Sequence, residues 1–414
     1  MNFEPINKVL VSLCFEDKPV SVGTLAIRDR KIYFEYDPNF LAQGLEISPL
    51  KCPLRPGVKS FNAMLFEGLP GVFNDSLPDG WGRLLLDRQK RAEGIRPEQL
   101  TPLDRLAYVG RHGMGALRYE PFYENQSPEE NIDLDSLALN SRQILTGAAS
   151  DIIDHLLALN GSSGGARPKA IIGVTADKQK IIHGSLAKRA YEPWLIKFPN
   201  LQDGNDAGAI EYVYALMAKN AGIDMMPVHL FPTKNNPGYF ACKRFDIKDN
   251  ERFHTHTVSG LLHSDFRLPS LDYQDLLTLT SSLTQDTREA EKMYRLAVFN
   301  VLAHNQDDHA KNFSFLMNKN GQWILSPAYD LTFSHGIGGE QSTMVIGEGR
   351  KISIEHLKAL GKSASLNTKK VTDIIDQVQS ALDDWKSLAK TYGVHQENIT
   401  DIYNVIELQR KNCD

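Results

Sequence analysis

The chain has 414 residues, of which 42% are hydrophobic and 23% charged, an ordinary composition for a globular protein with two or three packed parts. A formal net charge of −5 argues against a strongly basic surface that binds nucleic acid directly, and four cysteines without a CxxC pair disfavour a zinc ribbon or a disulfide scaffold. The N-terminus lacks the apolar core of a signal peptide, and no apolar run reaches the roughly 18 residues of a membrane span, so we expect a cytoplasmic protein.

The first third of the chain predicts strands, then a turn into a helix, then a linker. Residues 8–35 contain short β-branched and aromatic runs separated by turn residues, which is typical of two or three strands. A Pro-Asp-Gly turn at 78–80 leads into a helix that carries three consecutive leucines. Residues 121–135 are polar and form the best linker candidate.

The remainder predicts a mixed sheet followed by a helical region. A helical pattern over 136–159 precedes a glycine-rich turn and an apolar strand, and WLIKFPN (194–200) is a second short strand. An amphipathic helix with a glycine C-cap follows over 207–223, and GYFACKRFDI (238–247) is a further strand. From about 270 onward the pattern is mostly helical. This order favours an α+β fold with a mixed α/β lobe followed by an α-rich lobe.

The stretch HNQDDHAKN (304–312) concentrates polar residues within an apolar context. Apolar residues at helical spacing over 288–304 predict a buried helix that leads into it. Alternating apolar residues after Asn312, an Asn-Gly turn at 320–321 and a return through Trp323 predict a β-hairpin, which runs into SPAYD (326–330). The unit is therefore a helix, a polar loop, a hairpin and an aspartate.

Phosphotransferases of the kinase type need these parts in this order. An aspartate orients the attacking hydroxyl or accepts its proton, and an asparagine and a second aspartate hold Mg²⁺ against the ATP phosphates. Asp307 and Asn312 lie five positions apart, and Asp330 follows the hairpin. Carboxylate and amide oxygens are hard ligands that suit Mg²⁺. Lys311 is placed to neutralise charge that develops on the transferred phosphoryl group.

This stretch has two other interpretations. A solvated loop that caps a helix explains an isolated Asp-Asn pair, but it does not explain the ordered set. A metal hydrolase would need His304, His309, Asp307 and Asp308 to converge on a cation, yet the adjacent His-Asp pair of the usual phosphohydrolase site and an HExxH helix are both missing. His309 fits a structural hydrogen-bonding role in the loop better than a metal ligand.

An upstream region supplies candidates for nucleotide binding. In GSSGGARPK (161–169), Gly164 and Gly165 leave backbone amides unscreened, although the stretch is not a GxxxxGK[ST] loop. Lys197 lies in an apolar strand about thirty residues later, where a lysine that pairs ATP phosphates is expected. Glu211 on the next helix is the natural carboxylate to hold this lysine, and a solvent-facing glutamate is the alternative. Backbone groups of Lys243 and Phe245 fall where adenine would be contacted.

With these residues in hand, the sequence resembles the HipA family of serine/threonine kinases, the toxins of bacterial HipBA-type toxin–antitoxin modules. The resemblance runs over nearly the whole chain and rests on LPDGWGR (77–83), SSGGARPKA (162–170), LIKFP (195–199), KRFD (243–246), DDHAKNFS (307–314) and SPAYD (326–330). The form D-x-H-x-x-N in DDHAKN is also similar to that of lipid kinases.

The resemblance implies a two-lobed protein-kinase-like fold that uses ATP and Mg²⁺. It implies a family-specific N-terminal subdomain at 1–125, a nucleotide-binding part at 126–247 and an α-rich catalytic lobe at 248–414. The implied roles are catalytic for Asp307 and Lys311, metal-binding for Asn312 and Asp330, and nucleotide-binding for Ser163, Gly164, Gly165, Ala166, Lys169, Lys197, Lys243, Phe245 and His309. Lys243 departs from the glutamate often found at this position in relatives, which affects nucleotide affinity only if its side chain reaches the ribose.

The family also implies regulation and partners. Members autophosphorylate a serine before the glycine-rich loop, which ejects the loop; the matching residue is Ser162, with Ser163 as a neighbouring competitor. A phosphate there would be repelled by bound ATP. The expected partner is a helix-turn-helix, HipB-like antitoxin that binds operator DNA, and the substrate class includes aminoacyl-tRNA synthetases. Two alternatives remain: a catalytically silent co-repressor that acts through its antitoxin, and a small-molecule or lipid kinase.

Overall fold

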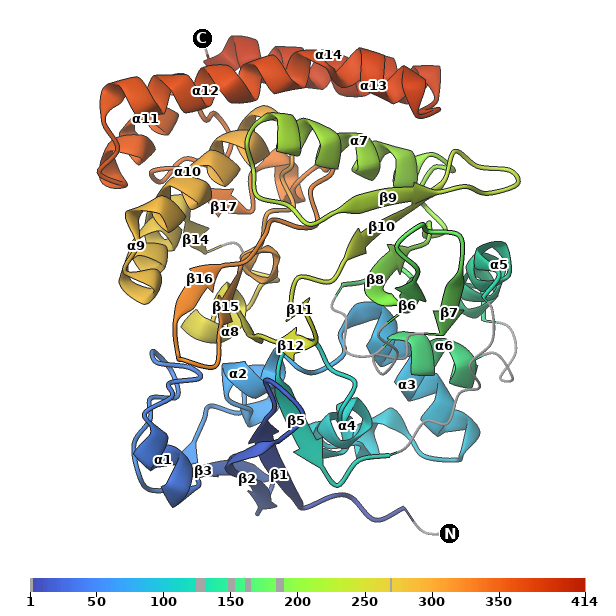
Figure 1. The fold of residues 1–414 in the computed structure, drawn as a ribbon, viewed down its shortest axis with the longest axis vertical. Coiled ribbons are helices and arrows are strands. Elements are labelled where there is room, and N and C mark those ends of the chain that lie inside the picture. Colours follow the sequence, from blue (N-terminus) through green and yellow to red (C-terminus); the bar gives the residue numbers. More distant parts are fainter. Residues whose placement is uncertain are drawn as a thin grey trace. The chain divides into compact units, whose positions relative to one another are not determined.

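The computed structural model describes residues 3–123, 132–147, 153–160, 165–183, 190–268 and 270–413. The chain combines sheets and helices in two compact units, each made of segments distant in sequence (Figure 1). Unit 1 comprises Met1–Gln202, Ala241–His263 and Leu316–Gly321, and unit 2 comprises Asp203–Phe240, Ser264–Phe315 and Gln322–Asp414. None of the helices in the described ranges is long and apolar enough to cross a membrane.

The first sheet of unit 1 is antiparallel, with strand order β4-β3-β2-β1-β5 (Figure 1). Its strands are β1 Lys8–Leu13, β2 Val20–Arg28, β3 Lys31–Tyr36, β4 Lys59–Ser60 and β5 Leu117–Glu120. The strands expected over 8–35 are therefore confirmed. Val9, Val11 and Leu13 alternate with more exposed residues and are buried, as expected when one face of a sheet covers the core.

A second antiparallel sheet in unit 1 carries the nucleotide-binding candidates. It consists of β7 Ile181–His183, β6 Lys169–Val174, β8 Glu192–Lys197 and the part of β10 (Tyr239–Lys243) that begins at Ala241, in that order. Every residue of β6 is buried, and from Ala170 to Val174 this matches a continuous apolar run. Short strands β11 Ile247–Lys248, β12 Glu251–Arg252 and β13 His254–Thr257 follow.

The helices of unit 1 include one that was predicted from the sequence and one predicted helix that is divided in two. They are α1 Pro38–Gln43, α2 Gly71–Asn74, α3 Gly80–Ala92, α4 Pro102–Val109, α5 Leu134–Leu145, α6 Ile153–Asn160 and α8 Val258–Leu262. The Pro-Asp-Gly turn does lead into α3, whose Leu85 and Leu86 are buried. The helical pattern over 136–159 forms two helices instead of one, because α5 ends at Leu145 before Thr146 and Gly147.

Unit 2 is mainly helical. Its helices are α7 Ala207–Asn220, α9 Tyr273–Thr284, α10 Thr287–Leu302, α11 Ile354–Ser363, α12 Thr368–Asp383, α13 Trp385–Thr391 and α14 Gln396–Cys413. Figure 1 shows α12, α13 and α14 running across α7 and α10, which they contact. The apolar stripe of α12, including Val371, Ile374 and Val378, is buried, so these C-terminal helices complete the core of the unit.

Short strands accompany the helices of unit 2. They are β9 Val228–Phe231, β14 Leu271–Asp272, β16 Trp323–Leu325 and β17 Thr343–Met344, together with β15 Ser314–Met317, whose first two residues belong to this unit. β15 and β16 are neighbours in one sheet, which confirms the expected hairpin, and Gly321 takes a left-handed φ of 78° in its turn. β14 and β17 pair in parallel.

Candidate active site

The helix α10 delivers the chain to the polar loop as the sequence indicates. Most of its residues from Met293 to Leu302 are buried, and the helix ends where His304 takes a left-handed φ of 54°. The Asp307 side chain is exposed, whereas its backbone N–H donates to Ser334 Oγ at 3.1 Å. Asn312 ends a short 3₁₀ turn, and its Nδ2 donates to the Asp307 carbonyl at 2.7 Å. The structure therefore brings the backbone of Asp307 and the side chain of Asn312 together.

Asp330 belongs to unit 2 and directly follows Tyr329, which is hydrogen-bonded to the turn at 310–312. The Tyr329 hydroxyl donates to the Lys311 carbonyl at 2.6 Å and lies 2.5 Å from Ser314 Oγ. Asp330 takes a left-handed φ of 59°, which is uncommon for a residue other than glycine and is found disproportionately at functional sites. The predicted order of loop, hairpin and aspartate thus forms one connected structure.

The residues of this turn fit a magnesium ion by their chemistry. The Asn312 amide nitrogen donates to the Asp307 carbonyl, so the Asn312 amide oxygen is not used in that bond. An amide oxygen from Asn312 and a carboxylate oxygen from Asp330 suit Mg²⁺, whose remaining ligands would be phosphate oxygens and water. His309 Nδ1 is buried and makes no hydrogen bond within the described residues, so the structural bond expected of this histidine is not seen at that atom. Lys311 Nζ lies 4.6 Å from the centroid of the Phe266 ring.

The metal-hydrolase alternative finds no support in the geometry. No group of three or more histidine, cysteine, aspartate or glutamate side chains in the described ranges could hold a metal ion. Asp308 is buried and bonds to Tyr273, while His304 pairs with His335 at 3.3 Å. The side chains of His304, His309, Asp307 and Asp308 therefore do not form the single metal site that a hydrolase would need.

In unit 1, the motif LPDGWGR supports the base of the glycine-rich stretch. Ser162, Ser163 and Gly164 lie outside the described residues. Gly165 takes a left-handed φ of 100°; its N–H donates to the Asp79 carboxylate, and its carbonyl accepts from Trp81 N–H at 3.1 Å. A Cβ atom on Gly80 would lie 2.6 Å from both the Ala166 Cα and the Gly165 carbonyl oxygen. Only glycine permits this approach, so the N-terminus of α3 fixes the backbone at Gly165 and Ala166.

Two lysines lie on one face of the second sheet beside Gly165. Lys169 on β6 pairs with Lys197 on β8 in the antiparallel register, so their side chains project from the same face. Lys169 is 4% exposed, and its Nζ contacts the position that a Cβ of Gly165 would occupy. The register therefore brings two basic side chains to the same face of this sheet, which is consistent with the predicted phosphate-binding role.

Three of the four residues in KRFD (243–246) take part in ion pairs. Lys243 Nζ pairs with Glu192 at 2.6 Å, so its ammonium group is held by a neighbouring strand. Arg244 and Asp246 form an almost fully buried ion pair at 2.7 Å, and Asp246 also accepts from Gly115 N–H at 2.7 Å. Burial would raise the pKa of Asp246, but Arg244, Arg252 and the Gly115 N–H hydrogen bond together hold the pKa below its usual value. Sequence reasoning singled out Lys243 and Phe245 and missed this structural pair.

The burial of Glu211 rules out the solvent-facing alternative for this residue. It is 3% exposed on α7 in unit 2, so it is not the solvent-facing glutamate considered from the sequence. A charged residue is rarely buried to this degree without a compensating partner. Its pairing with Lys197 stays a prediction.

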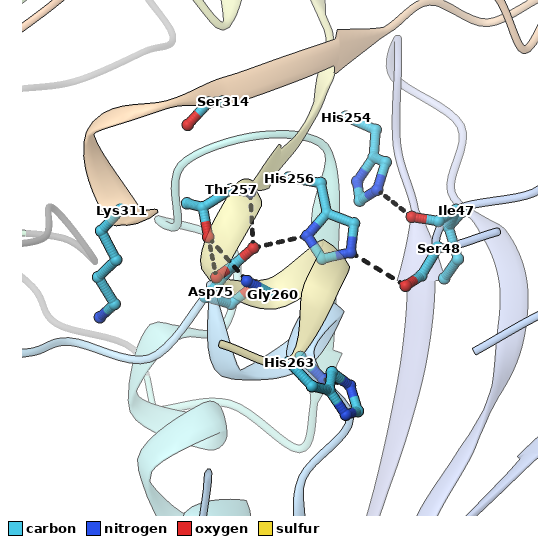
Figure 2. A network of polar contacts seen from close by, with 12 residues as sticks. Ile47, Ser48, Asp75, His254, His256, Thr257, Gly260, His263, Lys311 and Ser314 are labelled. Carbon is cyan, nitrogen blue, oxygen red and sulfur yellow. Dashed lines mark hydrogen bonds and ion pairs between the residues drawn. The ribbon is translucent and has the colours of Figure 1, made fainter. Parts of the chain in front are cut away.

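Figure 2 shows a second polar network, which the sequence did not indicate. His256 Nδ1 lies 2.6 Å from Asp75 Oδ2, and its Nε2 lies 3.0 Å from Ser48 Oγ. Asp75 also accepts from Thr257 N–H and Oγ1 at 2.8 and 2.7 Å. The Asp-His-Ser order matches that of a hydrolytic triad, but His256 and Ser48 are 0% and 1% exposed. With the serine enclosed, the network joins α2, β13 and the segment before Cys52 as a structural element.

Comparison with known proteins places the chain in a family. Residues 161–385 match the family described as the HipA-like C-terminal domain, and residues 16–120 match the HipA N-terminal domain. The Sinorhizobium fredii protein Y4dM, whose name describes it as a candidate kinase, is 24% identical over 329 residues, which cover 74% of this chain and 73% of that protein.

Solved structures agree in fold. HipA of Shewanella oneidensis, solved with HipB and its operator DNA, aligns with a TM-score of 0.70 at 16% identity and covers 97% of this chain and 96% of that chain. The Helicobacter pylori kinase CtkA aligns with a TM-score of only 0.38 at 15% identity over 54% of this chain and 88% of that chain, a likeness too weak to support a conclusion. Because one family match spans more than half of the sequence, the chain belongs to the HipA-like family.

Proposed function

We propose that the protein is an ATP-dependent serine/threonine kinase that acts as the toxin of a toxin–antitoxin module. The observation that carries the proposal is the connected turn of unit 2, in which Asn312 bonds to the Asp307 backbone and Tyr329, next to Asp330, bonds to the Lys311 carbonyl. The opposed pair Lys169 and Lys197 beside Gly165 supports the nucleotide-binding half of the proposal.

In the proposed reaction, a substrate hydroxyl oxygen attacks the γ-phosphorus of ATP, the bond to the β–γ bridging oxygen breaks, and ADP leaves. Asp307 orients the hydroxyl and receives its proton, and Lys311 is a cation for the transferred group. Asn312 and Asp330 would hold Mg²⁺, which supplies positive charge against the phosphates.

The other predicted site residues take nucleotide-binding roles in this proposal. Phosphates would be bound by Lys169, Lys197 and backbone amides of Ser163, Gly164 and Ala166. Gly165, whose N–H is held by Asp79, would contribute by leaving room for the phosphates. Adenine would lie at backbone groups of Lys243 and Phe245, with a further contact from His309. The proposal includes a two-lobed kinase-like arrangement, with the divisions 1–125, 126–247 and 248–414.

Regulation and partners extend the proposal. Phosphorylation of Ser162 by the protein itself would inactivate it, and a translation-related protein such as an aminoacyl-tRNA synthetase would be the external substrate. The Shewanella oneidensis relative was solved with HipB and operator DNA, which supports a similar antitoxin partner here.

The test is intact-protein mass spectrometry before and after incubation with Mg²⁺ and ATP, with fragmentation across 155–175. We expect a phosphate gain on Ser162 that is absent in Asp307→Asn and in Asp330→Asn. The surface variant Asp376→Asn, on the exposed side of α12, is the matched control and should gain phosphate as the parent does. Transfer that persists in both active-site variants would refute the assigned chemistry. ATP binding without any transfer would favour the co-repressor, and transfer to a small alcohol but not to protein would favour the small-molecule kinase.

A further inference from the structure

A buried tyrosine–aspartate pair lies immediately beside the proposed catalytic aspartate. Tyr273, the first residue of α9, is 0% exposed, and its hydroxyl donates to Asp308 Oδ2 at 2.5 Å. The same hydroxyl accepts from Asn300 Nδ2 on α10 at 2.9 Å. Asp308 is itself fully buried, directly after the exposed Asp307. The two adjacent aspartates therefore have opposite environments and different roles.

The second oxygen of Asp308 binds a different strand. Thr343 N–H on β17 donates to Asp308 Oδ1 at 3.1 Å, and Thr343 Oγ1 donates to the Asp308 carbonyl at 2.5 Å. β17 pairs in parallel with β14 through Leu271 and Thr343, and Tyr273 follows β14 directly. The contacts thus form a closed circuit from β14 through Tyr273 and Asp308 to β17 and back.

Hydrogen bonds extend this circuit to the backbone on both sides of Asp307. Asn300 Oδ1 accepts from Asn305 Nδ2 at 3.0 Å, and the Asn305 carbonyl accepts from Gln341 Nε2 at 2.6 Å. Ser334 Oγ donates to Asn305 Oδ1 at 2.9 Å and accepts from Asp307 N–H at 3.1 Å. The segment 334–343, which follows Asp330, is therefore bonded to the turn on either side of the exposed carboxylate.

We propose that Tyr273 and Asp308 are positioning residues, which fix the backbone of Asp307 and couple it to the segment 334–343. This inference rests on the proposed kinase function for its kinetic consequence. The Asp307 carboxylate is attached to this backbone, so a shift of the turn moves the carboxylate with it. Misplacement of a reacting group by about 1 Å typically costs on the order of 100-fold in rate. The pair belongs to unit 2 and makes none of the predicted nucleotide contacts, so its loss should affect the rate rather than nucleotide binding.

The kinetic test compares two tyrosine-to-phenylalanine variants. Tyr273→Phe removes one buried hydroxyl that bonds to the circuit. Tyr294→Phe, the matched control, removes a buried hydroxyl in the same unit whose bond goes to the Leu357 carbonyl at 3.1 Å. For Tyr273→Phe we expect kcat to fall about 10- to 100-fold while the Kd for a fluorescent ATP analogue changes less than about threefold. Tyr294→Phe should keep kcat within about threefold of the parent. Equal kcat values in the two variants would overturn the proposal.

A readout without catalysis separates this proposal from the kinase assignment. Amide hydrogen exchange over 303–312 and 334–343 should accelerate in Tyr273→Phe and not in Tyr294→Phe. Asp308→Asn, which keeps the size of the side chain, should show the same acceleration. If the parent protein transfers no phosphate, the proposed function fails, but the exchange data still decide whether the pair holds the turn. Unchanged exchange in both Tyr273→Phe and Asp308→Asn would refute the positioning role.

Discussion

Substitution of Gly80 by alanine should weaken ATP binding by moving the glycine-rich stretch. Gly80 begins α3 with a left-handed φ of 42°, and its missing side chain lets the backbone approach Gly165 and Ala166. An added Cβ would lie 2.6 Å from a carbonyl oxygen and 2.6 Å from a Cα atom. Both neighbours are backbone atoms, so no flexible side chain can turn away to relieve the contact.

The size of the effect follows from two separate costs. An ordinary contact begins at 3.4 Å, so the stretch must move by about 0.8 Å, the difference between 3.4 and 2.6 Å. Overpacking of this kind costs about 1–3 kcal/mol, which corresponds to a loss of roughly 5- to 150-fold in affinity if the displacement falls on the nucleotide site. The left-handed backbone adds about 1–2 kcal/mol to the loss of folding stability.

Gly94 provides a control for the backbone cost alone. It follows α3, takes a left-handed φ of 82° and has nothing within 4 Å of an added Cβ. Gly94→Ala should therefore lose folding stability in urea unfolding but retain ATP affinity, measured by titration calorimetry with the non-hydrolysed analogue AMP-PNP. Gly80→Ala should lose both. Equal analogue affinity in the two variants would refute the conclusion that α3 positions this stretch.

Three further predictions concern pH, a buried ion pair and the adenine region. Burial lowers the pKa of His254 to about 3, so below pH 6.5 the unfolded chain binds more protons than the folded protein. As the pH is lowered from about 6 to about 3, the free energy of unfolding should therefore fall by about 1.4 kcal/mol per pH unit. The variant His254→Gln should lose this dependence, and an unchanged slope of unfolding free energy against pH in that variant would contradict the prediction. Arg244→Met leaves the buried Asp246 without its guanidinium partner and should lower the free energy of unfolding by about 3–5 kcal/mol in chemical denaturation. The double variant Arg244→Met with Asp246→Leu should recover part of this loss. A loss below about 1 kcal/mol in the single variant would be inconsistent with a buried pair. Lys243→Ala should change ATP affinity less than about threefold, because its ammonium pairs with Glu192, and a tenfold loss in calorimetry would instead show that the side chain reaches the nucleotide.

Local sequence patterns are sufficient to predict the secondary-structure elements and the order of the candidate site. Alternating burial over β1, the apolar spacing of α10 and the Asn-Gly turn after β15 are all local patterns, and each forms the predicted element. Asp307 and Asn312 lie five positions apart, and a single 3₁₀ turn suffices to bring them together. Such features depend on periodicity and turn chemistry, which are encoded within a few residues.

Contacts between residues far apart in the sequence could not be predicted and follow from how the elements pack. Tyr273 and Asp308 are 35 positions apart, and Asp79 and Gly165 are 86 apart; neither pair has a local signal that names its partner. The sequence placed Glu211 on a helix but left open whether it faces solvent, and the packing of α7 buries it. Partner choice depends on how whole elements bury their apolar faces together, because an enclosed polar group must find its hydrogen bonds among the residues that packing places beside it.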